Sequence, residues 1–167
     1  GEPVCEKNSG CAGMLCQWDE NGNEISDTYL DTGYLPAISR YGYASVRGEY
    51  DSAGNLFKQS YYDANGEPMR IRENYASVEY EYDGIGNLAR TVYKDEFGKP
   101  CIITGGYAES RFGYDDRGNR ISERYYDEEG NQVIISEGYH ECRMLYDDYG
   151  NCIRIEYCDE NGDLFTN

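Results

Sequence analysis

Few residues in this chain have the chemistry of a catalytic group. His140 is its one histidine, and it stands where four other copies of an internal repeat, described below, carry alanine. A Ser/His or Cys/His arrangement would need this residue as its base. The many carboxylates recur at regular intervals, which is typical of turns and solvated strand faces. The sequence therefore predicts no catalytic residue and no enzymatic activity.

Metal-binding patterns are also missing. The segments D-E-N-G at 19–22 and 159–162 are rich in oxygen ligands, but they lack the alternating acidic ligands and the glutamate at the twelfth position of an EF-hand loop. None of the cysteine spacings gives the paired C-x2-C pattern of a zinc site. We expect no metal and no cofactor.

The seven cysteines are an odd number, so at least one is unpaired in a monomer. They fall at unrelated positions of the repeat, and we expect most of them to replace small apolar residues. Disulfide pairing stays open. The cysteines are Cys5, Cys11, Cys16, Cys101, Cys142, Cys152 and Cys158.

The charge balance excludes some partners. Aspartate and glutamate number 32 against 15 lysines and arginines, giving a formal net charge of −17. Such a chain is repelled by nucleic acid phosphates and by anionic lipid surfaces. No apolar run approaches the roughly 18 residues of a membrane span. We therefore expect neither nucleic-acid binding nor membrane insertion.

Tyrosine, with 19 copies, is the residue type best suited to binding. Four tyrosines recur every 32 residues on the face of the predicted strands that points outward. They could stack on sugar rings, provide a rigid protein-binding surface, or pack against a neighbouring strand. This candidate ligand-contact ladder consists of Tyr43, Tyr75, Tyr107 and Tyr139.

The whole chain is organised by this 32-residue period, which defines five copies of the motif aromatic-D-x-x-G-N. The copies cover 18–49, 50–81, 82–113 and 114–145, with partial repeats at 1–17 and 146–167. The motif's turn residues are Asp19, Gly22, Asp51, Gly54, Asp83, Gly86, Asp115, Gly118, Asp147 and Gly150. Aspartate at the first position can accept backbone N–H groups two or three residues on, and glycine at the fourth supplies a positive φ.

Each copy has two further turn signals. A second turn follows thirteen residues after the opening aromatic and is often closed by proline, which predicts a short third strand at an edge or outside the main ladder. A glycine or asparagine then precedes the next strand, in a position that favours a left-handed backbone. The residues at this last position are Gly10, Gly42, Asn74, Gly106 and Gly138.

Between the turns, apolar residues alternate with polar ones. In 75–82 one face carries Ala76, Val78, Tyr80 and Tyr82, which predicts a half-buried strand. After the hairpin turn we expect the inward face to continue through two positions of each repeat. These are Ile25, Phe57, Ala89, Ile121 and Ile153, then Tyr29, Tyr61, Tyr93, Tyr125 and Tyr157. The prediction is an all-β fold of tandem β-hairpins stacked into an elongated solenoid-like or superhelical array.

The motif Y-x-Y-D-x-x-G-N at 80–87, with Y-Y-D-x-x-G-x-P at 61–68 and G-Y-H at 138–140, resembles the YD-type (RHS-like) β-hairpin repeats of bacterial secreted, surface and toxin-associated proteins. The resemblance covers nearly the whole chain at the level of the repeat class. It implies elongated β-structure and an extracellular or cell-surface location, although the segment itself shows no signal peptide.

The function expected from these patterns is a non-enzymatic scaffold that binds another protein or acts as a spacer. The alternatives are a carbohydrate-binding module that uses the tyrosine ladder, and an accessory region of a larger surface enzyme or toxin. The expected partner is a surface glycan or another protein.

Overall fold

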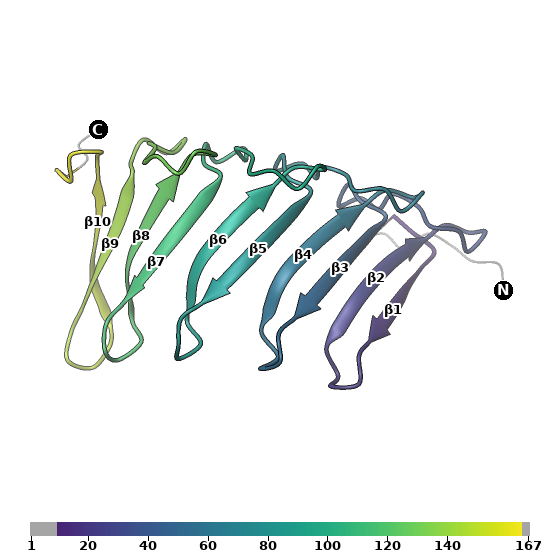
Figure 1. The fold of residues 1–167 in the computed structure, drawn as a ribbon, viewed down its shortest axis with the longest axis horizontal. Helices are drawn as coiled ribbons and strands as arrows, with labels where there is room; N and C mark the ends of the chain where they lie inside the picture. The colour runs from purple at the N-terminus through teal and green to yellow at the C-terminus, as the bar shows by residue number, and fades with distance from the viewer. Residues whose placement is uncertain (1–9, 165–167) are drawn as a thin grey trace. The chain divides into compact units, whose positions relative to one another are not determined.

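The computed structural model describes residues 10–164, and within this range it consists of ten β-strands without a helix (Figure 1). The prediction of an all-β fold of tandem hairpins is confirmed. Within the described range no helix is long and apolar enough to cross a membrane. The strands are β1 (Gly13–Trp18), β2 (Glu24–Leu30), β3 (Ser45–Tyr50), β4 (Leu56–Tyr62), β5 (Ser77–Tyr82), β6 (Leu88–Lys94), β7 (Glu109–Tyr114), β8 (Arg120–Tyr126), β9 (Glu141–Tyr146) and β10 (Cys152–Cys158).

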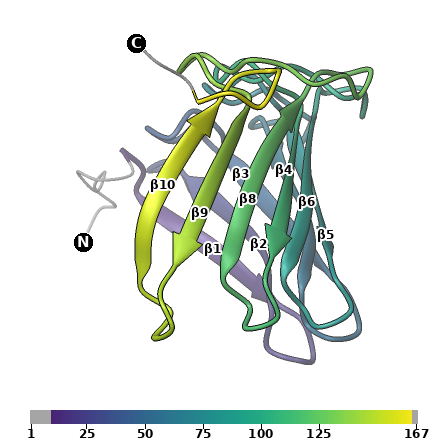
Figure 2. The same ribbon diagram turned by 90° about the vertical axis from the view of Figure 1, so that its left-hand side faces the viewer.

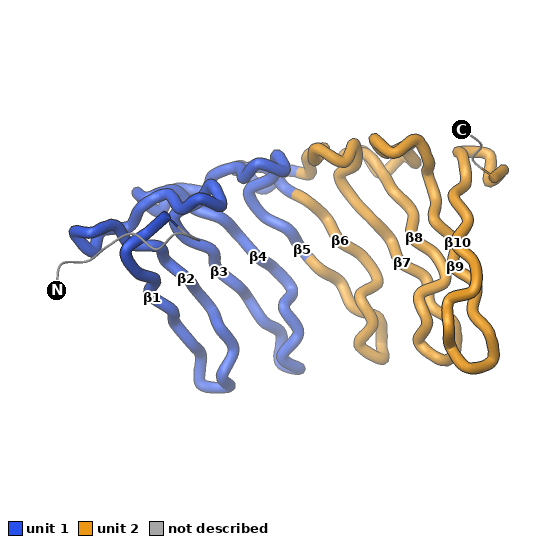
Figure 3. Tube along the Cα trace, turned by 180° about the vertical axis from the view of Figure 1, so that it is seen from behind, with its two compact units in different colours: residues 1–79, 94–99 blue, residues 80–93, 100–167 orange. Residues whose placement is uncertain are grey.

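The chain divides into two compact units (Figure 3). Unit 1 comprises residues 1–79 and 94–99 and so holds β1 to β4 and the start of β5. Unit 2 comprises residues 80–93 and 100–167 and holds the rest of β5, nearly all of β6, and β7 to β10. In each unit the strands form an antiparallel sheet in chain order, as Figure 2 shows for β8, β9 and β10.

Neighbouring hairpins pair along only part of their length. Within one hairpin, β3 and β4 are in register from Ser45↔Tyr62 to Tyr50↔Leu56. Between hairpins, β2 and β3 pair only from Thr28↔Ser45 to Ser26↔Arg47. Unit 2 repeats this arrangement at β8 and β9. Adjacent hairpins are therefore hydrogen-bonded near the connectors, and their turn ends lack these inter-hairpin bonds.

The buried residues follow from this pairing. Ala44 and Ala76 in unit 1 and Ala108 in unit 2 are nearly inaccessible, and each lies just before a strand at the connector end. Their backbone groups bond to both neighbouring strands; Ala44, for example, donates to Tyr62 O and accepts from Tyr29 N–H. A small side chain suits a position where three backbones meet. The core of each unit thus lies at the connector end of its hairpins.

A β-bulge beside each hairpin turn corrects one prediction about the inward face. Tyr50 pairs with Leu56 and Glu49 with Lys58, which leaves Phe57 as the extra residue. Phe57 is 39% exposed, and its unit 2 equivalents Ile121 and Ile153 are 39% and 65% exposed. The expectation that they point inward is wrong, because the extra residue interrupts the strict alternation on which it rested.

The predicted third strand is shorter than expected. In unit 1, Pro36 and Pro68 form isolated bridges with Leu30 and Tyr62, and in unit 2 Gln132 bridges Tyr126 in the same way. Each bridge consists of two backbone bonds, which in the second copy are Asp63 N–H to Glu67 O and Met69 N–H to Tyr61 O. The segment stays outside the main ladder, as predicted, and because Gln132 forms the same bridge the missing N–H of proline is not the cause.

The left-handed positions before each strand are confirmed, with φ between +72° and +97° at Gly10, Gly42, Asn74, Gly106 and Gly138. The connector turn of the first copy differs from the others. Its glycine, Gly33, comes one residue early, so Tyr34 takes the left-handed conformation with φ +60°. The early glycine therefore leaves a tyrosine in the left-handed conformation, while the turn keeps its hydrogen bond from residue 34 N–H to Asp31 O.

The opening aromatic of the motif also joins consecutive hairpins through its hydroxyl group. Tyr50 donates to Glu24 O at 3.1 Å in unit 1, and in unit 2 Tyr114 and Tyr146 donate to Leu88 O and Arg120 O at 2.9 and 3.0 Å. This bond explains why the position is tyrosine rather than phenylalanine. Trp18 holds the place in the first copy, where the described residues contain no earlier hairpin.

Candidate functional site

The motif's aspartates form dense hydrogen-bond networks in the hairpin turns. Asp83 Oδ1 accepts the N–H groups of Ile85 and Asn87, and Asp83 Oδ2 accepts the side-chain amide of Asn87. These bonds, led by the Asn87 N–H, lower the pKa of Asp83. Gly86 follows with φ +92° and donates to Asp83 O. The other four turns have the same geometry, so these carboxylates are occupied by backbone donors and serve the fold.

The four tyrosines of the candidate ladder each lie within a row of ring contacts. In unit 1 the Tyr43 ring is 5.9 Å from Tyr29 and 4.9 Å from Tyr61, and Tyr61 is 5.8 Å from Tyr75. In unit 2 the row runs Tyr93, Tyr107, Tyr125, Tyr139 and Tyr157, with neighbouring centroids 4.6 to 6.0 Å apart. The sequence predicts these tyrosines on two opposite faces. In each unit their rings instead lie in one row, in which the two predicted sets alternate.

The reason lies in where the strands begin. β3 starts at Ser45 and β9 at Glu141, so Tyr43 and Tyr139 belong to the connectors and not to the alternating strand. Their rings meet the next ones edge-on or tilted, at 60° for Tyr43 against Tyr61. All four ladder tyrosines are half-buried, and burial raises the pKa of Tyr43, Tyr107 and Tyr139. Each unit thus presents a packed row of tyrosine rings, in which the ladder tyrosines are partly accessible and Tyr61 and Tyr125 are buried.

His140 is 4% exposed and occupies the alanine position of the repeat. Its Nδ1 lies 3.0 Å from Val133 O, which can only accept, so Nδ1 carries the proton. The ring also meets Tyr126 edge-on at 6.2 Å. These contacts place His140 in the core of unit 2, away from solvent.

The cysteines divide into buried and accessible positions. Cys16, Cys142, Cys152 and Cys158 are free thiols, and Cys158 is fully buried. Cys101 is also buried, at the repeat position held by Ala37, Met69 and Val133. Cys5 lies outside the described residues.

Two buried glutamates distinguish unit 2. Glu109 is 5% exposed and accepts from Arg90 at 2.5 Å and from Arg111, while Glu141 is 4% exposed and contacts Arg124 at 2.8 Å and Arg143 at 2.7 Å. Burial alone would raise the pKa of Glu109, but the bonds from Arg90 and Arg111 outweigh it and hold the pKa below its ordinary value. Both carboxylates are therefore ionised structural groups.

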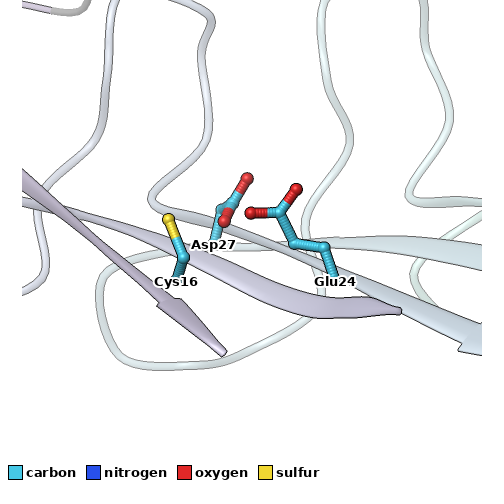
Figure 4. A group of neighbouring side chains, drawn as sticks. All are labelled: Cys16, Glu24 and Asp27. Carbon is cyan, nitrogen blue, oxygen red and sulfur yellow. The ribbon is translucent and has the colours of Figure 1, made fainter. Parts of the chain in front are cut away.

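One cluster combines three potential metal ligands from two strands. Cys16 of β1 and Glu24 and Asp27 of β2 each offer one ligand atom, and these atoms lie within 4.8 Å of one another (Figure 4). Contact with the Asp27 carboxylate, followed by burial, raises the pKa of the Cys16 thiol to about 11. Asp27 also raises the pKa of Glu24. The sequence analysis missed this cluster.

Comparison with solved structures finds similar chains among Tc toxins. The crystal structure titled TcdB2-TccC3-TEV is 19% identical with a TM-score of 0.38, and the Photorhabdus luminescens Tc holotoxin pore with a mutated TccC3 is 19% identical with a TM-score of 0.39. Each match covers 86% of this chain and 7% of the other, so this chain spans a small fraction of their length. No protein-family model and no curated protein matches the chain.

Proposed function

We propose that this chain is a non-enzymatic repeat module of a secreted or cell-surface protein, which binds another protein or acts as a spacer. The half-buried ladder tyrosines in the row of each unit carry the proposal. Tyrosine offers a rigid, amphipathic contact surface at low entropic cost and is enriched where proteins bind each other. The contacts between neighbouring rings hold the tyrosines of each row in place, so little order has to be gained on binding.

The charge and the sequence resemblance support the same conclusion. A net charge of −17 disfavours polyanionic partners and suits a protein partner with a basic surface. The YD-type resemblance of the motif supports an extracellular or cell-surface location. His140 is 4% exposed in the core of unit 2, and the turn aspartates bind backbone N–H groups, so both fit structural roles.

Carbohydrate binding through the same tyrosines is the second candidate, favoured by the regular recurrence of Tyr43, Tyr75, Tyr107 and Tyr139. Sugar stacking needs an open ring face, and the tilted and edge-on contacts within each row reduce the open area. For this reason we place protein binding first. An accessory role in a larger surface enzyme or toxin is the third, and a catalytic domain elsewhere in the gene would favour it.

Site-specific photo-cross-linking on the full-length protein tests the proposal. A photoreactive phenylalanine is introduced at Tyr75 or Tyr107, and at Tyr149 as the control because that side chain is 92% exposed at a hairpin turn. We expect one protein species to be cross-linked from Tyr75 and Tyr107 and not from Tyr149. A glycan-array signal that Tyr75→Ala and Tyr107→Ala abolish, with no protein cross-link, would contradict the proposal and support carbohydrate binding.

A further inference from the structure

The first hairpin brings a thiol and two carboxylates to one point. Cys16 and Asp27 are directly paired across β1 and β2. Glu24 pairs with Trp18 on the far side of the bulge, so it shares the face of Asp27 although the two are three residues apart. In an unbroken strand that spacing would place them on opposite faces. The bulge thus assembles the three side chains (Figure 4).

Asp27 also has an unsatisfied atom in this cluster. Its Oδ1 is buried and accepts no hydrogen bond from the described residues. Across residues 10–164 no lysine or arginine forms an ion pair with Glu24 or Asp27. Both residues line a cavity of about 110 Å³, beside Gly48. A buried carboxylate oxygen that accepts no hydrogen bond is costly, even though the Asp27 side chain as a whole is only half-buried, and a bound cation would remove that cost.

The repeat itself does not require these residues. The same three positions in the other hairpins carry no comparable set of ligands. They hold Gly48, Leu56 and Gln59, then Tyr80, Leu88 and Thr91, then Phe112, Arg120 and Glu123, and finally Met144, Cys152 and Ile155. The cluster is therefore an addition to the hairpin and not part of its folding pattern.

We propose that Cys16, Glu24 and Asp27 bind one zinc ion between β1 and β2. Thiolate sulfur favours zinc over magnesium and calcium, and carboxylate oxygens are also zinc ligands. In tetrahedral coordination the ligand atoms stand roughly 3.5 Å apart given the usual zinc–ligand bond lengths, so small side-chain rotations suffice. Three protein ligands leave the fourth position to water.

Cobalt and zinc titrations of the purified, chelator-treated chain test this site. The probe is Co²⁺, whose thiolate complexes absorb through sulfur-to-metal charge transfer, followed by displacement with Zn²⁺. Cys152→Ser serves as the matched control because Cys152 is an exposed free thiol on the last hairpin. Circular dichroism verifies that each variant keeps the β-fold.

We expect one equivalent of Co²⁺ to produce the charge-transfer band in the wild-type chain and in Cys152→Ser. Cys16→Ser should abolish the band. Asp27→Asn and Glu24→Gln, which keep the thiol, should each weaken zinc binding at least ~10-fold, since even residues that only orient ligands cost 10–100-fold. No saturable binding, a band that survives Cys16→Ser, or a band lost equally in Cys152→Ser would overturn the proposal.

Discussion

The junction between β2 and β3 in unit 1 and the junction between β6 and β7 in unit 2 have the same backbone register and different chemistry. Ser26 pairs with Arg47 in the first junction, and Arg90 pairs with Arg111 in the second. The next two residues of each strand pair in the same register in both junctions. Both arginines on the later strand stack on a tyrosine ring, Arg47 over Tyr62 at 4.1 Å and Arg111 over Tyr126 at 3.9 Å.

The difference between the two junctions is a buried ion cluster. Two arginines directly opposite each other repel, and Glu109 lies between them and accepts from both. In unit 1 the equivalent residue is Ser45, and the opposing residue is the neutral Ser26. The comparison teaches that the turns and backbone ladder determine the register, while the side chains at a junction can change as a set.

The largest expected effect comes from removing one member of the unit 2 set. Glu109→Ser should lower the free energy of unfolding by about 2 kcal/mol, less than the ~3–5 kcal/mol of a fully buried pair because both guanidinium groups are partly exposed. The control is Glu81→Ser, whose carboxylate contacts the same Arg90 at 2.6 Å but is 61% exposed. It should cost under about 0.5 kcal/mol. Equal urea midpoints for the two variants would show that burial of Glu109 contributes nothing.

A substitution in the shared hairpin turns should have the second largest effect. Gly86→Ala should cost ~1–2 kcal/mol because it forces a side chain into the left-handed region, although the space around its Cβ is open. Gly84→Ala, in the same turn with equally open space and no positive φ, should be nearly neutral. Thermal melts compare the two, and a similar loss at both positions would contradict the turn geometry.

The hydroxyl bond between consecutive hairpins should contribute a smaller amount. Tyr114→Phe removes the donor to Leu88 O without changing the ring, and we expect a loss of ~1 kcal/mol. Tyr149→Phe is the control, since Tyr149 is 92% exposed. If chemical denaturation finds the two variants alike, the hydroxyl bond does not stabilise the junction.

The sequence predicts the structure best at positions where only one or two residue types can adopt the required backbone conformation. Gly86 and Asn74 indicate a left-handed backbone, because few other residues adopt it. The recurrence of Asp83 and its equivalents every 32 residues indicates the hairpin turns. It fails at Phe57 because the bulge adds a residue that alternation does not count. The bulge also hides the cluster of Glu24 and Asp27, which alternation would assign to opposite faces.

Pairing between strands is the other information that the sequence lacks. Nothing in the spacing indicates that Arg90 and Arg111 stand opposite each other or that Glu109 joins them, because the register between hairpins appears only in the folded chain. The same holds for the merged tyrosine rows, since Tyr43 lies in a connector whose path the period of two does not describe.

A double-mutant cycle on Arg90 and Glu109 tests most directly whether the junction side chains change as a set on a fixed backbone. Arg90→Ser with Glu109→Ser reproduces the Ser26 and Ser45 chemistry of unit 1 beside an unchanged Arg111 and Tyr126. We predict that the double variant recovers most of the stability lost in Glu109→Ser and unfolds within about 1 kcal/mol of wild type, because the opposed arginines are gone. A double variant as unstable as Glu109→Ser alone, measured by urea denaturation, would contradict the account.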